Sequence, residues 1–139
     1  MEKNKFQLKH PEGTEIDKKI VVSLQKVADG MNVSCARATE VSRQLNVSMI
    51  DVGRNLDLGG FFIVDCQLGI FGKSKKTVTP AQSVPDKLEV AISSSLENGR
   101  LSCATAWELA KQFQLPRKEI AQVCEKLNVK IKPCQLGAF

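Results

Sequence analysis

The cysteines are the residues whose number and spacing first suggest chemistry in this chain of 139 residues. Cys35 and Cys66 are each followed 68 residues later by another cysteine, Cys103 and Cys134, and Cys124 is the fifth. Four such thiols in one place would bind zinc or an iron–sulfur cluster, and two would form a redox-sensitive pair. Against a metal site, the chain has no Cys-x-x-Cys motif, and cysteine is readily buried for packing alone. The sequence leaves both readings open.

Residues suited to enzyme catalysis are scarce. The chain has no tyrosine, and its one histidine, His10, lies in a polar N-terminal segment. It also has no glycine-rich phosphate loop and no Gly-x-Ser-x-Gly motif, so acid–base and nucleophile–base pairs lack their usual members. Asp51 and Glu119 stand at matching positions, but they fit exposed helix charges more simply. We therefore expect a protein that is not an enzyme and that uses no cofactor.

The spacing of the cysteines belongs to an internal repeat. The segment Cys-Gln-Leu-Gly-x-Phe at 66–71 returns at 134–139, and 12 of the 39 positions in 33–71 are identical to those 68 residues later, without a gap. Such self-similarity indicates two copies of one folding unit. Small units bury little apolar surface alone, so we expect the two to pack together. The expected division is a flexible leader at 1–13, unit 1 at 14–72, a basic linker at 73–83 and unit 2 at 84–139.

The hydrophobic pattern predicts the same elements in both units: a helix, a very short strand, a second helix, a turn, a third helix and another short strand. Ser34 and Ser102 are placed to cap the second helix, and Thr14 or Asp17 can cap the first helix of unit 1. The Cys-Gln-Leu-Gly-x-Phe segment should then double back as a minimal β-hairpin. The predicted fold class is mainly α with short β-hairpins, an α+β arrangement of two tandem three-helix units.

The second and third helices of each unit are joined by a short turn and share a pattern of apolar residues. These are Ala38, Val41, Leu45, Val47, Val52 and Leu56 in unit 1 and Ala106, Leu109, Phe113, Leu115 and Ile120 in unit 2. This pattern resembles the apolar framework of the winged helix-turn-helix superfamily of DNA-binding domains. Asn46 and Gln114 depart from the family pattern, because a glycine is often found at this place in the turn.

The resemblance implies that the third helix of each unit enters the major groove, where its early turns read base edges and basic neighbours hold phosphates. In unit 1, Arg54 stands near Asp51, a carboxylate that would repel phosphate. Unit 2 offers guanidinium, ammonium and amide groups, which contact guanine, phosphate and adenine. The candidate DNA-binding residues are Ser48, Met49, Asp51, Arg54 and Asn55 in unit 1, Arg117, Lys118, Gln122 and Lys126 in unit 2, and Lys73, Lys75 and Lys76 in the linker.

The charge distribution favours unit 2 as the DNA-binding unit. Residues 1–72 hold nine Lys/Arg and nine Asp/Glu, whereas residues 73–139 hold eleven and six, which places the whole net charge of +5 in the second half. We expect double-stranded DNA as the partner, with unit 1 used for packing or dimerisation. A homodimer is expected because palindromic operators favour two-fold symmetric readers.

Two other functions stay open from the sequence. The first is a non-catalytic protein–protein interaction adaptor built on the same units, with Trp107 as a docking residue. The second, weaker one is a thiol- or metal-sensing regulator that uses Cys35, Cys66, Cys103 and Cys134. The chain has no apolar run of 18 or more residues and no signal-peptide pattern, so we expect a cytoplasmic transcription regulator that does not interact with membranes.

Overall fold

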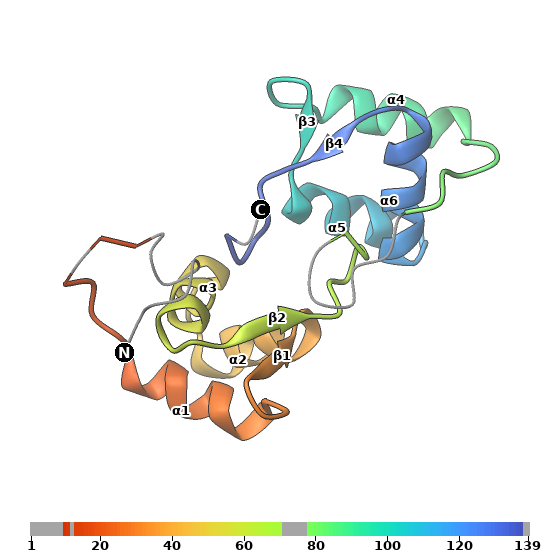
Figure 1. Ribbon diagram of the computed structural model, residues 1–139. Helices are drawn as coiled ribbons and strands as arrows, with labels where there is room; N and C mark the ends of the chain where they lie inside the picture. The colour runs from red at the N-terminus through yellow and green to blue at the C-terminus, as the bar shows by residue number, and fades with distance from the viewer. Residues whose placement is uncertain (1–9, 12, 71–77, 138–139) are drawn as a thin grey trace. The chain divides into compact units, whose positions relative to one another are not determined.

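Six helices and four short strands make up the part of the chain that the computed structural model describes, residues 10–11, 13–70 and 78–137. The prediction of a mainly helical fold is confirmed. Unit 1 contains α1 (Lys18–Val27), β1 (Asn32–Ser34), α2 (Cys35–Leu45), α3 (Met49–Leu58) and β2 (Phe62–Val64) (Figure 1). Unit 2 contains α4 (Asp86–Ser94), β3 (Arg100–Leu101), α5 (Cys103–Gln112), α6 (Arg117–Lys126) and β4 (Lys130–Ile131). The order of elements is the same in both units, and α6 begins and ends 68 residues after α3.

The helix starts follow local capping rules. Asp17 caps α1, because its Oδ1 accepts hydrogen bonds from the amides of Lys19 at 3.0 Å and Ile20 at 3.4 Å. The hydroxyl of Ser34 accepts from the amide of Arg37 at 3.2 Å at the start of α2. In unit 2, Ser102 caps α5 in the same way. The two predicted serine caps are confirmed, and of the two candidates for α1 the cap is Asp17.

A left-handed residue makes the turn between the second and third helices of each unit. Asn46 has φ 54° and ψ 46°, and Gln114 has φ 56°. Neither residue is glycine, but asparagine tolerates this conformation better than most residues do. The turn also supplies hydrogen-bond donors to carbonyl groups that are unpaired at the end of the helix. In unit 1 the amide of Val47 donates to the carbonyl of Ser42 at 3.0 Å. The third helix then begins after Ser48 or Pro116, so in each unit a short turn joins the second and third helices.

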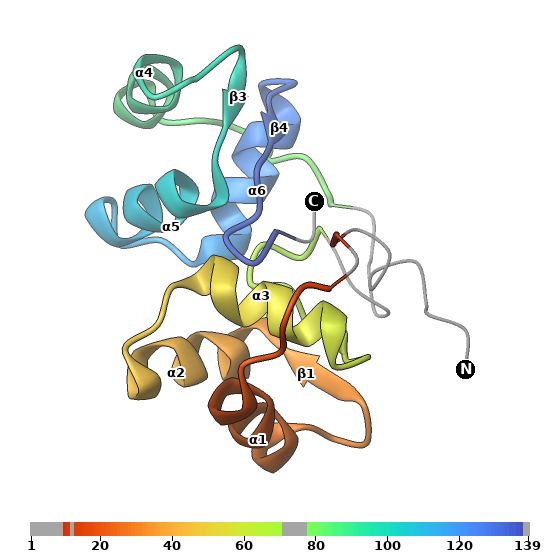
Figure 2. The same ribbon diagram turned by 90° about the vertical axis from the view of Figure 1, so that its left-hand side faces the viewer.

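The described strands pair in parallel, and the hairpins predicted at 66–71 and 134–139 extend into residues outside the described range. β1 pairs with β2, with Val33 opposite Ile63, and β3 pairs with β4, with Leu101 opposite Ile131. Figure 2 shows β3 and β4 side by side. Parallel strands need a long crossover, which the second and third helices of each unit supply. The glycine after Cys66-Gln67-Leu68 suggested a hairpin turn. Gly69 does have φ 75°, but the expected return strand lies beyond residue 70, outside the described range.

Each compact unit includes a buried leucine that the internal repeat would assign to the other unit. Leu136 and Gly137 belong to unit 1, and Gln67–Ile70 belongs to unit 2, which differs from the division expected at 14–72 and 84–139. Leu136 and Leu68 are both buried. The buried apolar residues that accompany them are Ile20, Leu24, Val33, Cys35, Ala38, Val41, Val52, Leu56 and Phe61 in unit 1, and Leu88, Ile92, Leu101, Cys103, Ala106, Leu109, Ala110, Ile120, Ala121, Val123, Cys124 and Ile131 in unit 2.

Two segments expected to be loose are held by hydrogen bonds where they are described. His10, assigned to the leader, is half-buried, and its Nε2 lies 2.8 Å from Oδ2 of Asp57. At the end of the expected linker, the amide of Ala81 donates to the carbonyl of Gln122 in α6 at 3.0 Å. Within the described residues, the helices are all too short or too polar to cross a membrane.

Candidate nucleic-acid interface

The exposed side of α6 carries as many acidic as basic groups. Lys118 and Lys126, both predicted to bind DNA, are exposed to solvent. Glu119 and Glu125 are exposed on the same helix, and Gln122 is half-buried between them. Residues three and four apart are neighbours on a helix surface, so the lysines and glutamates share one face. The α6 face is therefore close to neutral, and a phosphate backbone would meet repulsion as well as attraction there.

Arg117, the first residue of α6, makes side-chain contacts within unit 2. Its guanidinium carbon lies 3.6 Å from the ring centroid of Trp107, a cation–π contact, and Nη1 donates to Oε1 of Gln67 at 3.3 Å. Arg117 and Trp107 are both half-buried. The indole Nε1 of Trp107 is buried and has no hydrogen-bond partner among the described residues. Arg117 is thus held in place by packing, which makes it a weaker candidate for DNA contact than its position in the sequence suggested.

The third helix of unit 1 does not present the predicted polar surface. Arg54 pairs with Asp51, with Nη2 2.7 Å from Oδ1, so much of its charge is already balanced. Asn55 was expected to be exposed, and that prediction was wrong because the residue is completely buried. Its Oδ1 accepts from the amide of Asp17 at 2.7 Å and its Nδ2 donates to the carbonyl of Asp51 at 2.9 Å. These bonds give Asn55 a structural role.

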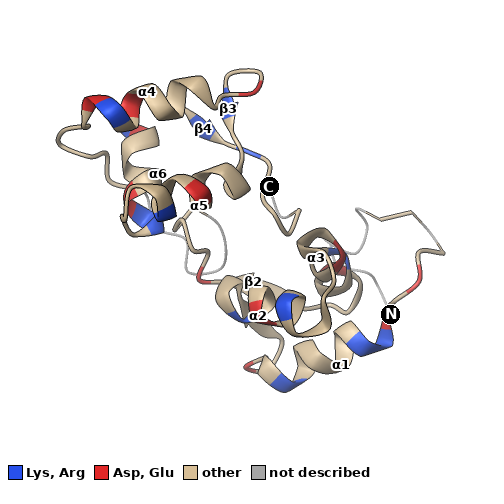
Figure 3. Cartoon of the chain, turned by 180° about the vertical axis from the view of Figure 1, so that it is seen from behind, with Lys and Arg blue, Asp and Glu red and all other residues tan. Residues whose placement is uncertain are grey.

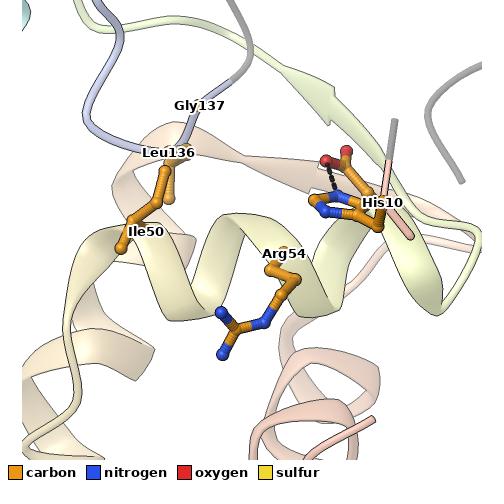
Figure 4. A pocket seen from close by; sticks show the side chains of 6 residues that line it. His10, Ile50, Arg54, Leu136 and Gly137 are labelled. Carbon is orange, nitrogen blue, oxygen red and sulfur yellow. Dashed lines mark hydrogen bonds and ion pairs between the residues drawn. The ribbon is translucent and has the colours of Figure 1, made fainter. Parts of the chain in front are cut away.

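A hollow of about 280 Å³ lies beside α3 in unit 1. Figure 4 shows His10 at one end of it and Ile50 with Leu136 at the other. Arg54 and Asp57 also line it, and Ile50 is 54% exposed. A histidine–carboxylate pair can orient a general base, but the residues that line this hollow include no hydroxyl or thiol that could act as a nucleophile. The hollow therefore offers a binding surface rather than a recognisable catalytic arrangement.

Three cations that the sequence interpretation missed line one face of the β3–β4 pair. Arg100, Lys130 and Lys132 are all exposed, and Leu101 and Ile131, which alternate with them, are buried on the opposite face. Figure 3 shows blue, basic segments on β3 and β4. The sequence signal for this basic face is the strict alternation of apolar and basic residues at 129–132, Val-Lys-Ile-Lys. We name Arg100, Lys130 and Lys132 the ribbon face. Its hollow of about 260 Å³ is lined by Glu97, Asn98, Arg100, Ser102, Lys132 and Pro133.

None of the five cysteines forms a disulfide bond. Cys35 and Cys103 are buried, Cys66 and Cys134 are half-buried, and burial raises the pKa of the Cys124 thiol from 9.0 to about 11. Among the described residues, His, Cys, Asp and Glu side chains do not gather in a group of three or more that could hold a metal ion. The four repeat-matched cysteines are therefore not brought together as a metal site.

Two of the predicted phosphate contacts, Lys75 and Lys76, lie outside the described residues, as does Lys73. Of the remaining predicted DNA-binding residues, the structure leaves Lys118 and Lys126 exposed and Gln122 half-buried, and it pairs Arg117 and Arg54 with neighbours. Comparison of the chain with protein-family models, with curated proteins and with solved structures finds no match.

Proposed function

We propose that this protein is a non-catalytic regulator that binds double-stranded DNA, with unit 2 as the DNA-contacting unit and unit 1 serving for packing or dimerisation. The observation that carries the proposal is that unit 2 combines a helix-turn-helix with an array of exposed cations on its surface. Neither feature is sufficient alone, because helix-turn-helix units also serve as protein-docking modules and many soluble proteins carry basic side chains.

The local geometry of unit 2 supports the first half of the proposal. α5 and α6 are joined by the left-handed residue Gln114, and Pro116 precedes the first turn of α6. The amide of Leu115 donates to the carbonyl of Ala110 at 2.9 Å and so closes the end of α5. This is the short, fixed connection that a helix-turn-helix uses to hold its third helix at an angle to the second.

The charges of unit 2 support the second half. The acidic residues Glu119 and Glu125 oppose the lysines on α6, whereas the ribbon face carries three cations. Such a surface favours contact with the phosphate backbone, which is independent of base sequence, over base reading by α6. We therefore propose an affinity for duplex DNA that depends strongly on salt and weakly on sequence.

The test is fluorescence anisotropy of a labelled 20-base-pair duplex of mixed sequence, titrated with the full chain at several chloride concentrations. We expect the logarithm of the association constant to fall linearly with the logarithm of the salt concentration, with a slope of roughly −0.9 for each phosphate neutralised. A single strand of the same length and composition serves as the matched control, and it should bind more weakly with a shallower slope. A lack of duplex binding at low salt would overturn the proposal.

That negative outcome would favour the protein–protein interaction adaptor, the first of the two other functions left open by the sequence. The surface to test would then be the hollow beside α3, because Ile50 is a large apolar side chain that is 54% exposed there. An Ile50→Glu variant would be compared with the wild type for capture of protein partners.

A further inference from the structure

We infer that the ribbon face of unit 2, and not the third helix α6, is the surface that holds the phosphate backbone. This inference rests on the proposed DNA binding and names the site where it occurs. The residues concerned are Arg100 in β3, Lys130 in β4 and Lys132 immediately after β4.

Strand geometry places the three cations on the same side. Arg100 and Lys130 are directly opposite each other in the parallel pair, so their side chains lie on the same face of it. The backbones of paired strands are about 4.8 Å apart. Lys132 follows Lys130 by two residues, which in extended chain brings it to that face again about 6.6 Å further along. The amide of Lys132 donates to the carbonyl of Leu101 at 2.8 Å, so the backbone of this lysine is fixed to β3.

The matching strands of unit 1 provide an internal comparison. The positions 68 residues before Arg100, Lys130 and Lys132 are occupied by Asn32, Phe62 and Val64. These three are half-buried and uncharged, whereas the cations of unit 2 are exposed. The same parallel pairing occurs in both units, so the strands themselves do not require basic residues. The charges on the ribbon face therefore need an explanation other than the fold.

The arrangement is unfavourable without an anionic partner. Like charges directly opposite each other on paired strands destabilise the pair. None of the three cations forms an ion pair with a carboxylate among the described residues. Glu97 is the one acidic residue in the lining of the hollow, which Arg100 and Lys132 also line. An anion on this face would remove the repulsion between Arg100 and Lys130.

An extended polyanion fits the ribbon face better than a small anion does. The cations are exposed along an open surface, and the described residues offer no buried charged side chain there to enclose a single phosphate. Successive phosphates of a nucleic-acid strand can neutralise several cations at once and release their counterions, which a discrete anion does not do.

The test compares two triple variants that lose the same charge. Arg100→Gln/Lys130→Gln/Lys132→Gln removes the ribbon face, and Lys111→Gln/Lys118→Gln/Lys126→Gln removes three exposed lysines from α5 and α6 of the same unit. In the anisotropy assay described above, loss of three phosphate contacts should make the salt slope shallower by about 2.7 for the ribbon variant. The helix variant should change the slope by less than about 0.9, the amount expected for one contact.

The alternative outcomes separate this inference from the proposed function. A larger effect of the helix variant, or equal effects of the two, would overturn the ribbon face as the site while leaving DNA binding intact. No binding by the wild type would defeat the proposed function itself. Inorganic phosphate that competes more strongly than chloride at equal ionic strength would show a discrete anion site and also overturn the inference.

Circular dichroism and the emission of Trp107 would check that each variant is folded. Should a triple variant fail to fold, the single variants Lys130→Gln and Lys132→Gln are used against Lys118→Gln. Each ribbon substitution should make the slope shallower by about 0.9, and the helix substitution should leave it unchanged. A reversed order would overturn the inference.

Discussion

The backbone amide of Asp17 donates a 2.7 Å hydrogen bond to the side-chain Oδ1 of Asn55, 38 residues later in the chain. Asp17 is the N-cap of α1 and Asn55 lies in the middle of α3, so one amide group joins the start of the first helix to the third. The same side chain donates to the carbonyl of Asp51. A fully buried amide that is satisfied in this way holds the two helices in one relative position.

Asn55→Val should therefore destabilise the protein. Valine is the residue at the matching position of unit 2, Val123, so the shape is acceptable to this fold, but the carbonyl of Asp51 and the amide of Asp17 lose their partner. We expect the free energy of unfolding to fall by about 1–3 kcal/mol, measured by urea denaturation. Arg54→Ala is the matched control, because it breaks a half-exposed ion pair worth only about 0–1 kcal/mol. Equal effects of the two substitutions would contradict this role for Asn55.

Local rules explain which parts of the fold were predictable. The caps at Asp17 and Ser34 depend on residues within one helical turn, so the sequence displays both partners. The pairing of Val33 with Ile63 depends on the fold of the two helices that connect their strands. The residues next to each strand do not indicate whether the strands run parallel or antiparallel.

The candidate site was predictable to a smaller extent for the same reason. The exposure of Lys118 followed from its place on a helix, but the burial of Asn55 depends on a distant amide. The ribbon face was missed because Arg100 and Lys130 are 30 residues apart and become neighbours only once the strands pair. Sequence position alone also could not show that Arg117 packs on Trp107.

Gly53→Ala is expected to be destabilising although alanine favours helices. A Cβ at this buried position of α3 would overlap the backbone carbonyl of Leu136, which cannot rotate away as a side chain can. The helix gains about 1 kcal/mol from alanine, but steric overlap in a packed core typically costs about 1–3 kcal/mol, and displacement of Leu136 exposes a buried leucine. Urea denaturation should show a net loss of stability.

Shortening the chain gives this prediction an internal control. In a chain ended after Gln135, the overlapping carbonyl is removed, so Gly53→Ala should become stabilising by about 1 kcal/mol. This change of sign distinguishes a clash with Leu136 from a general intolerance of alanine in α3. The same sign in both chains would refute the proposed contact.

Arg117→Ala should alter the surroundings of Trp107. Loss of the guanidinium uncovers the indole ring, and Trp107 is the one tryptophan of the chain, so its emission maximum should move to longer wavelength. We expect a loss of about 0.5–2 kcal/mol in the free energy of unfolding from the cation–π contact. Lys118→Ala, one residue away and exposed, is the control and should change neither quantity. Unchanged emission in Arg117→Ala would argue against the stacking.

The buried thiol of Cys124 should make the protein less stable at alkaline pH. Burial raises its pKa in the folded state from 9.0 to about 11, so the folded protein retains the thiol proton after the unfolded chain has lost it. The contribution to stability is complete below pH 9 and is lost as the pH rises from 9 to about 11. Because one pKa unit corresponds to about 1.4 kcal/mol, the complete loss should be on the order of 3 kcal/mol.

Urea denaturation of the wild type and of Cys124→Ala at pH 7.5 and pH 10.5 would measure this loss. All other ionisable groups are the same in both proteins, so their effects cancel in the difference. Cys124→Ala should therefore lose less stability between the two pH values than the wild type, even though its stability at pH 7.5 is lower because a buried side chain has been shortened. Cys134→Ala, which removes a thiol that is only half-buried, is the control for the loss of a cysteine. An identical pH dependence in all three proteins would show that the Cys124 thiol ionises no later in the folded state than in the unfolded chain.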